Sequence, residues 1–190
     1  MRTLISFGIL FLLCSVINAE EVSGIKEYNQ GRAYYEVQQD FEKARIEFEK
    51  VVNNYPGSPL EVYAMSKIGW CYFEEKKYDD AIVWFKKVVE KYPDTGISDD
   101  AQYQIGYILF KQGKYDSAIK EFKKVIENYG DKEDKLKKDR CPFAQYMLGE
   151  SYEKMGKVDE ARMAYLEVIA KYPKSSEARR ALKRLEEMMR

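Results

Sequence analysis

Apolar and polar positions repeat along most of the chain with a long, regular period. Four segments each carry an alanine, an aromatic residue four positions later and a valine three positions after that, which is the spacing of one helix face. Successive alanines are separated by 37, 37 and 43 residues, so the pattern predicts four copies of one structural unit. The copies contain Ala44-Phe48-Val51, Ala81-Phe85-Val88, Ala118-Phe122-Val125 and Ala161-Tyr165-Val168.

A second helical pattern precedes each of these segments. In three copies it contains a glycine at the same place, namely Gly69, Gly106 and Gly149. Two helices joined by a short turn cross closely, and a side chain at the crossing would hold them apart, so we expect the glycine to lie there. In the first copy Arg32 takes the glycine position, and Gly31 comes one residue early.

Turn and capping signals separate the predicted helices. Gly113 and Gly156 come at the ends of first helices, where glycine is the preferred terminator. A carboxylate falls near the start of three second helices, where it interacts well with the helix dipole; these residues are Asp79, Asp116 and Asp159. The run Ser58-Pro59-Leu60-Glu61 predicts a capping box with proline in the first turn.

These signals predict helix-turn-helix units over residues 25–57, 60–94, 98–130 and 142–174. A charged insertion over residues 131–140 is interpreted as a solvated loop or an extra helical turn. The segment 175–190 is predicted to be a last helix that covers the fourth unit, with an apolar face made of Ala178, Ala181, Leu182 and Leu185.

The order Gly-x-x-Tyr, Ala-x-x-x-Phe-x-x-Val and Tyr-Pro resembles the tetratricopeptide repeat across residues 25–173. The resemblance implies an all-α fold, a right-handed α-solenoid of four repeats with a C-terminal capping helix. The 37-residue spacing and the Tyr-Pro ending are similar to a bacterial envelope subgroup. That subgroup includes the repeat domain of the Tol-Pal-associated cell division coordinator and the lipoprotein of the outer-membrane β-barrel assembly machine. The sequence shows neither the N-terminal coiled coil of the coordinator nor the lipobox of the lipoprotein.

The N-terminal segment has the pattern of a secretory signal peptide. Arg2 precedes an uncharged, mostly apolar run of 15 residues, whereas a membrane-spanning helix needs roughly 20. Ala19 before Glu20 gives the best cleavage site. We therefore expect a signal peptide over residues 1–19, export to the periplasm through the Sec pathway, and no stable membrane anchor after cleavage.

Two other interpretations of this segment remain open. Cys14 could be an acylation site, although Leu13 precedes it where a lipobox needs a small residue. The apolar run could also be an uncleaved anchor.

Composition narrows the functional classes. The chain has 32 basic and 32 acidic residues and no histidine. Without histidine there is no Ser-His or Cys-His nucleophile pair and no imidazole metal ligand. The balanced charge gives no field that would favour nucleic acid. We expect a protein that is not an enzyme, with no cofactor, no metal and no nucleic-acid partner.

Two cysteines follow the predicted signal, Cys71 and Cys141, two repeats apart. Helices packed at intervals of about 8–10 Å would place their Cα atoms beyond the limit of about 7 Å for a disulfide. We therefore expect no disulfide, with Cys71 buried and Cys141 in a loop.

The first helix of each helix-turn-helix repeat carries a second stripe of side chains. In the fourth repeat this stripe ends with Glu150 and Glu153, and in the first repeat it contains only Asn29, Ala33 and Glu36. Elsewhere the stripe is aromatic, and aromatic side chains supply large contact areas at a small entropic cost. We therefore predict a partner-binding groove formed by Tyr63, Trp70, Phe73, Tyr103, Tyr107, Phe110, Phe143 and Tyr146.

An apolar helical or extended peptide would fit such a groove. The same rings could instead pack between adjacent first helices, or could bind a second copy of the chain as a homo-oligomer. We interpret the chain as an exported scaffold for a protein or peptide of the cell envelope, acting in envelope assembly or division. A structural homo-oligomer and an accessory domain of a cell-wall or polysaccharide enzyme are the alternative functions.

Overall fold

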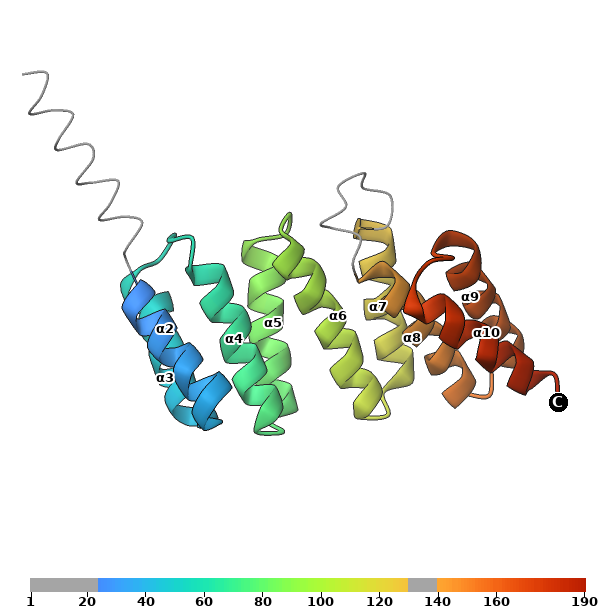
Figure 1. The fold of residues 1–190 in the computed structure, drawn as a ribbon, viewed down its shortest axis with the longest axis horizontal. Helices are drawn as coiled ribbons and strands as arrows, with labels where there is room; N and C mark the ends of the chain where they lie inside the picture. Colours follow the sequence, from blue (N-terminus) through green and yellow to red (C-terminus); the bar gives the residue numbers. More distant parts are fainter. Residues whose placement is uncertain (1–23, 130–139) are drawn as a thin grey trace, which may run out of the picture. The chain divides into compact units, whose positions relative to one another are not determined.

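The computed structural model of the chain describes residues 24–129 and 140–190 (Figure 1). The signal peptide predicted over residues 1–19, with its cleavage site at Ala19 and Glu20, lies outside the described residues, and so does the charged insertion apart from its last residue. Every regular element in the described ranges is a helix, so the predicted all-α class is confirmed. The helices form repeated hairpins of an α-solenoid.

The chain divides into two compact units, Met1–Trp84 and Phe85–Arg190, with the boundary inside one helix. The first unit contains α2 (Ile25–Ala33), η1 (Tyr34–Gln38), α3 (Phe41–Asn54), α4 (Glu61–Glu74) and the beginning of α5 (Tyr78–Lys91). Helix α3 packs against both α2 and α4. The buried core between these helices is made of Ala44, Phe48, Val51, Ala64, Ile68 and Cys71.

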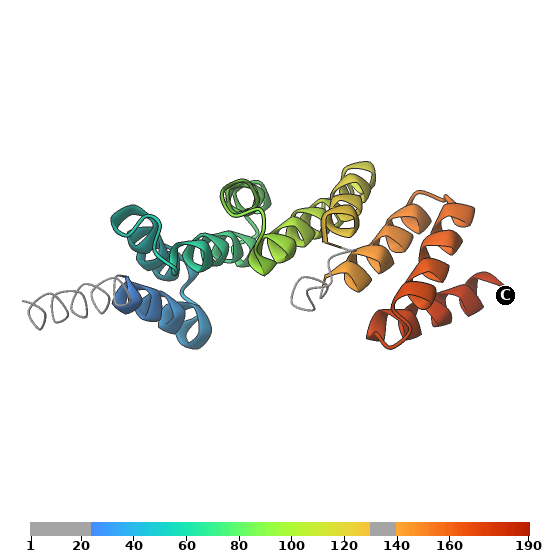
Figure 2. The same cartoon turned by 90° about the horizontal axis from the view of Figure 1, so that it is seen from above.

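The second unit continues from Phe85, and its described residues form five further helices. They are α6 (Gly96–Lys111), α7 (Tyr115–Tyr129), α8 (Cys141–Lys154), α9 (Val158–Lys171) and α10 (Ser176–Met188). Figure 2 shows α6–α7 in green to yellow and α8–α9 in orange as two hairpins, and α7 packs against α8. The alanines, aromatic residues and valines of the repeated pattern are buried in this unit, as their helical spacing predicts.

Glycine lies where the two helices of a hairpin cross. A Cβ atom added to Gly106 would come within 2.7 Å of the ring of Phe122, and one added to Gly149 within 2.6 Å of the ring of Tyr165. Both aromatic residues are fully buried and cannot move aside cheaply. The role predicted for these glycines is therefore confirmed.

In the first hairpin the crossing residue is Gly31, so the placement of Arg32 at this position is wrong. A Cβ atom on Gly31 would lie 2.8 Å from the ring of Phe48, whereas Arg32 is exposed. The chain continues from α2 into η1, which is a π-helical turn. A π turn holds one residue more than an α turn, so counting back from Ala44 with α-helical spacing misplaces the glycine by one.

The turn inside each hairpin places one residue in the left-handed backbone region. The φ angles are 53° at Gln39, 61° at Lys76, 74° at Gly113 and 72° at Gly156. The predicted helix-ending glycines are therefore confirmed, and two repeats use a side-chain-bearing residue for the same turn. The carboxylates predicted near helix starts lie in first turns, at Asp79, Asp116 and Asp159.

The capping box predicted at the start of α4 is wrong, and so is the proline in its first turn, because the helix begins at Glu61 and Pro59 precedes the N-cap residue. Leu60 occupies the N-cap position with helical backbone angles, and its side chain makes no capping hydrogen bond. The carboxylate of Glu61 accepts a hydrogen bond from the backbone N–H of Gly57 at 2.6 Å. The Ser58 hydroxyl is buried and has no hydrogen-bond partner within the described residues.

Both described cysteines are free and fully buried. Cys141 begins α8, and its thiol donates a hydrogen bond to the carbonyl oxygen of Val125 at 3.8 Å, so its prediction as a loop residue is wrong. Burial raises the pKa of Cys71 to about 12. That thiol is therefore protonated at neutral pH and is a poor nucleophile.

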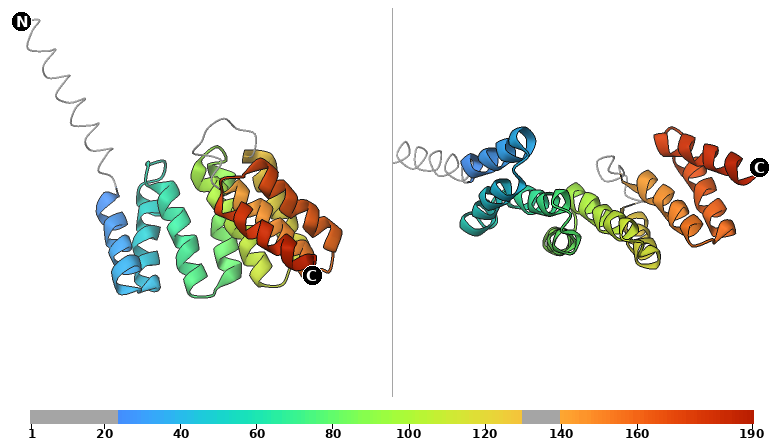
Figure 3. Two further views of the ribbon diagram at one scale, coloured as in Figure 1. Left: turned by 45° about the vertical axis from the view of Figure 1, so that its right-hand side comes forward. Right: turned by 90° about the horizontal axis from the view of Figure 1, so that it is seen from below.

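Helix α10 covers the end of the second unit, where it packs on α8 and α9 (Figure 3). The side chain of Ser175 accepts a hydrogen bond from the N–H of Ala178 at 3.0 Å and caps the helix. Ala178, Ala181 and Leu185 are buried against the unit. Leu182 is 52% exposed, so the predicted apolar face is too broad by this residue.

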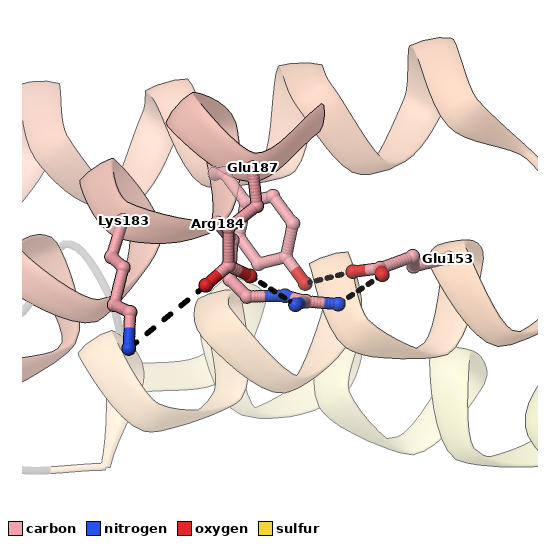
Figure 4. Close-up of polar contacts among 5 residues, drawn as sticks. Glu153, Lys183, Arg184 and Glu187 are labelled. Carbon is pink, nitrogen blue, oxygen red and sulfur yellow. Dashed lines mark hydrogen bonds and ion pairs between the residues drawn. The ribbon is translucent and has the colours of Figure 1, made fainter. Parts of the chain in front are cut away.

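Arg184 connects α10 to α8. Its guanidinium contacts the carboxylates of both Glu153 on α8 and Glu187 on its own helix (Figure 4). The hydroxyl of Tyr165 donates a hydrogen bond to the same Glu153 carboxylate at 3.0 Å. Burial first and Glu153 second raise the pKa of Tyr165 far above its usual value. One carboxylate thus holds three helices together.

Candidate partner-binding surface

In the first unit, α4 carries three of the predicted binding residues. Tyr63 is 49% exposed, and Trp70 and Phe73 are half-buried. Tyr63 and Trp70 are seven residues apart, so they lie on the same side of the helix two turns apart. The rings of Trp70 and Phe73 meet edge to face with centroids 5.5 Å apart. This geometry fixes the orientation of Trp70.

The first repeat contributes aromatic residues that the sequence pattern missed. The ring of Tyr28 lies 5.5 Å from that of Phe48, and burial raises the pKa of its hydroxyl. Tyr28 comes three residues before Gly31, as Tyr103 comes three residues before Gly106. Counting from the correct glycine would have revealed it.

Tyr35 is the second residue that was missed. Its ring lies 5.4 Å from Phe41, and its hydroxyl donates a hydrogen bond to the Glu74 carboxylate at 3.5 Å. The Lys67 ammonium lies 4.8 Å from its ring centroid. Burial first and Glu74 second raise the pKa of Tyr35 far above the usual range. The stripe assigned to this repeat, Asn29, Ala33 and Glu36, is therefore wrong by the same one-residue shift.

In the second unit Tyr103 belongs mainly to the core. It is 9% exposed, and its ring lies 5.8 Å from Phe122. Tyr107 stacks on it with centroids 6.2 Å apart and remains half-exposed. Phe110 is also half-exposed, with its ring 5.4 Å from Tyr115. Of these predicted residues, Tyr107 and Phe110 offer the accessible rings.

Arg140 joins the two hairpins of the second unit. It forms an ion pair with Asp100 at 2.5 Å, and its guanidinium lies 5.7 Å from the Tyr103 ring and 5.6 Å from the Phe143 ring. An arginine this close to two rings is held in place by cation–π attraction. It also gives the half-exposed Phe143 a polar neighbour.

Helix α10 closes the part of the stripe that belongs to the fourth repeat. Tyr146 is 3% exposed, with the Arg180 guanidinium 4.2 Å from its ring centroid and the Tyr165 ring 5.5 Å away. Glu153, predicted as part of an acidic end of the groove, is held by Arg184 and Tyr165. Neither Tyr146 nor Glu153 is therefore available on this surface in the described structure.

The predicted aromatic side chains that remain accessible form one set in each unit. The first set, on α4, is Tyr63, Trp70 and Phe73, and the second set, on α6 and α8, is Tyr107, Phe110 and Phe143. The binding role of these residues stays a prediction.

The sequence model of the tetratricopeptide repeat-like domain matches residues 18–187. The chain belongs to this family. No curated protein matches the sequence of the chain at a significant level. Tetratricopeptide domains typically act as protein-interaction scaffolds rather than catalysts, and the chain shares that architecture.

Solved structures of other tetratricopeptide proteins have a similar fold. One is a tetratricopeptide repeat protein from Parabacteroides merdae, with a TM-score of 0.69 and 14% identity over 88% of this chain and 60% of that protein. This chain therefore spans 60% of that protein's length. Another is MamA, with a TM-score of 0.57 and 26% identity over 75% of this chain and 74% of MamA. These similarities support the tetratricopeptide fold.

Among the described residues, no helix is long and apolar enough to cross a membrane. Among the same residues, no group of three or more cysteine or carboxylate side chains is arranged to hold a metal ion.

Proposed function

We propose that this tetratricopeptide chain is an exported scaffold that binds a protein or peptide partner in the bacterial cell envelope, in the assembly or division of that envelope. It would bind through the two aromatic sets and would have no catalytic activity of its own. The observation that carries the proposal is the 49% exposure of Tyr63 beside the half-buried rings of Trp70 and Phe73. Aromatic rings at such surfaces are typical of binding hot spots.

Export is supported by the sequence pattern at the N-terminus. A basic residue, a short apolar run and Ala19 before Glu20 have the order of a secretory signal. Mass spectrometry of the chain recovered from the periplasmic fraction of an expressing bacterium would measure the N-terminus. We expect Glu20 as the first residue. An intact N-terminus on protein found only in the cytoplasm would contradict export.

The envelope subgroup is supported by the spacing of the repeats and by the closing helix. The first two intervals of 37 residues and the Tyr-Pro endings are similar to the repeat domain of the Tol-Pal-associated division coordinator. The same comparison led us to expect a capping helix, and α10 has that place in the second unit.

The binding role can be tested with variants that remove one ring from each aromatic set. Affinity-tagged full-length chain would be used to capture partners from a cell-envelope fraction, and a purified partner would then be titrated. We expect Trp70→Ala combined with Tyr107→Ala to weaken binding at least tenfold, which corresponds to about 1.4 kcal/mol. The matched control is Val83→Ala combined with Leu182→Ala, because both residues are exposed and apolar but lie outside the sets.

Circular dichroism would show that both double variants are folded. A partner that binds the aromatic double variant as tightly as the native chain would contradict the proposed surface. If light scattering shows self-association that the same double variant abolishes, the partner is a second copy of the chain, and the homo-oligomer alternative replaces the heterologous partner.

A further inference from the structure

A groove separate from the aromatic sets lies between α7 and α9, with α8 as its floor. Its volume is about 490 Å³, within the size range of about 300–1,000 Å³ typical of ligand sites. Gln145 and Leu148 line it, each two residues along α8 from Phe143 and Tyr146. Two residues apart on a helix correspond to about 200° of rotation. The groove therefore lies on the opposite side of α8 from the predicted aromatic stripe.

The equivalent groove one repeat earlier, between α5 and α7 over α6, has a volume of about 270 Å³. Glu121 lies in it, where the carboxylate accepts a hydrogen bond from the Gln102 side-chain amide at 2.6 Å. The Lys124 ammonium lies 3.0 Å from the same carboxylate. A satisfied polar network thus occupies part of this groove.

The larger groove lacks the carboxylate side chain that lies in its neighbour. Residues 43 positions apart are equivalent in the third and fourth repeats, so Ala164 corresponds to Glu121 and Gln145 to Gln102. The Gln145 amide donates to the carbonyl oxygen of Ala164 at 3.4 Å, because the carboxylate is missing. Trp84 holds the same position 37 residues before Glu121, and it packs on the core of the first unit. Of the three residues, Ala164 has the smallest side chain, and its groove is the larger of the two described.

The charge of the two grooves differs as well. The smaller one is lined by two lysines and two glutamates, whereas the larger one is lined by one lysine and four carboxylates. Lys124 is replaced by Glu167, and Ser117 by Glu160, at equivalent positions. The carboxylates are Glu127, Asp159, Glu160 and Glu167, and the lysine is Lys123.

These carboxylates are weakly neutralised. Asp159 has Arg162 at 3.5 Å and Glu167 has Lys171 at 3.6 Å, and both are exposed pairs of small energetic value. Within the part of the chain that the structure describes, Glu127 and Glu160 form no ion pair. The rim of the groove therefore carries a net negative potential.

Apolar and aromatic side chains also line the groove. Ile126, Leu148, Tyr152 and Met163 line it, and Met163 is 60% exposed. A flexible methionine adapts its shape to different apolar partners. Apolar side chains inside an acidic rim fit a segment that carries both apolar and basic side chains.

We propose that the groove between α7 and α9 binds a cationic amphipathic peptide segment of a partner protein. An apolar side chain of that segment would occupy the space that Ala164 leaves open, and its lysine or arginine side chains would pair with Glu127 and Glu160. The proposal does not depend on the aromatic sets, because it uses the opposite side of α8.

The probe for the test is a fluorescein-labelled peptide of alternating lysine and leucine, titrated against the full-length chain by fluorescence anisotropy. The matched peptide alternates glutamate and leucine at the same length. We expect saturable binding of the lysine peptide that weakens with added salt, and no saturable binding of the glutamate peptide. Equal binding of both peptides, or saturable binding of neither, would overturn the proposal.

Variants locate the binding in this groove. Ala164→Trp fills it with the residue found at the equivalent position 84, and we expect at least about tenfold weaker binding of the lysine peptide. Glu127→Gln combined with Glu160→Gln changes only surface carboxylates and keeps the test valid if the tryptophan variant fails to fold. We expect this pair to weaken binding at least about threefold and to reduce its salt dependence.

Two controls complete the experiment. Glu121→Ala opens the neighbouring groove, which keeps its two lysines, and Trp70→Ala removes a ring of the aromatic set on α4. We expect native affinity for the lysine peptide in both variants. Native affinity in the Glu127→Gln/Glu160→Gln variant, or lost affinity in Trp70→Ala, would place the binding elsewhere.

Discussion

The ring of Phe48 lies so close to Gly31 that a Cβ atom on that glycine would be 2.8 Å from the ring. The two residues are 17 positions apart, whereas Gly106 and Phe122, which make the same contact, are 16 apart. The contact is thus preserved across an insertion, and the π-helical turn η1 absorbs the extra residue.

We expect Gly31→Ala to lower the free energy of unfolding by about 1–3 kcal/mol, because overpacking against a buried ring forces a backbone shift. Arg32→Ala is the control, since Arg32 is exposed and its ion pair with Glu36, at 3.0 Å, is exposed as well. We expect the free energy of unfolding of this control to stay close to that of the native chain. Urea denaturation would measure both. A larger loss of stability in Arg32→Ala than in Gly31→Ala would show that Arg32, the residue given by α-helical counting, lies at the helix crossing.

The π turn itself can be tested by removing Val37, which is 80% exposed within η1. The deletion gives the first repeat the spacing of the others, so we expect helix content to be retained and stability to change by less than about 1 kcal/mol. Deleting Lys111, at the end of the regular helix α6, is the matched control, and we expect a loss of at least about 2 kcal/mol. Circular dichroism and urea denaturation would compare them. If both deletions lower the free energy of unfolding equally, the extra residue of the first repeat is not the reason for the π turn η1.

The contact between α10 and α8 gives a third prediction. We expect Arg184→Met to lower stability by about 1–2 kcal/mol, because it leaves the partly buried carboxylate of Glu153 without its cation. Lys183→Met is the control on the same helix, where Lys183 reaches Glu187 at 3.9 Å in a highly exposed pair. The control should change stability by less than about 0.5 kcal/mol. Thermal unfolding would measure both variants. An equal loss of stability in the two would show that the ion pair of Arg184 makes no net contribution to stability.

Alkaline pH should destabilise the second unit through its buried tyrosines. Burial raises the pKa of Tyr103 and of Tyr146 to about 12, whereas an unfolded tyrosine titrates near 10. Between these values the unfolded chain binds fewer protons than the folded chain, so stability is complete below about pH 10 and falls as pH rises toward 12. Each tyrosine contributes a fall of roughly 1.4 kcal/mol per pH unit at most.

The measurement is urea denaturation of the native chain and of the variant Tyr103→Phe/Tyr146→Phe at pH values from about 9 to 11. Lysines titrate in the same range, so the difference between the two proteins is the informative quantity. We expect the double variant to lose less stability with rising pH. Parallel curves for the two proteins would contradict the raised pKa values.

The fold could be predicted from the sequence where each hairpin has regular geometry. The pairs Gly106–Phe122 and Gly149–Tyr165 follow from helical spacing and a short turn, and both form. The first repeat could not be placed in this way, because a π turn adds a residue without a clear local signal. Gly31 itself offered the clue, since it stood one place from the expected position.

The candidate site was harder to predict than the fold. The spacing showed which aromatic residues share a helix face, but it did not show what covers that face. Tyr146 is buried because Arg180 of the closing helix lies over it, and the orientation of that helix is not encoded in the repeat pattern. The small side chain of Ala164 could have been noticed in the sequence. Finding it requires a comparison of the residues that differ at equivalent positions of the repeats, and not only of the residues that the repeats share.

Glu121 and Ala164 differ at one equivalent position, while the contacts Gly106–Phe122 and Gly149–Tyr165 persist in the same hairpins. Different residues thus determine how the two helices of a hairpin pack and which side chain lies in the groove. Substitution at this one position in the third and fourth repeats therefore changes the lining of a groove without altering the residues of the glycine–aromatic contact. The repeats therefore form an evolvable array in which new binding specificities can arise one junction at a time, and a protein engineer could program the same positions independently.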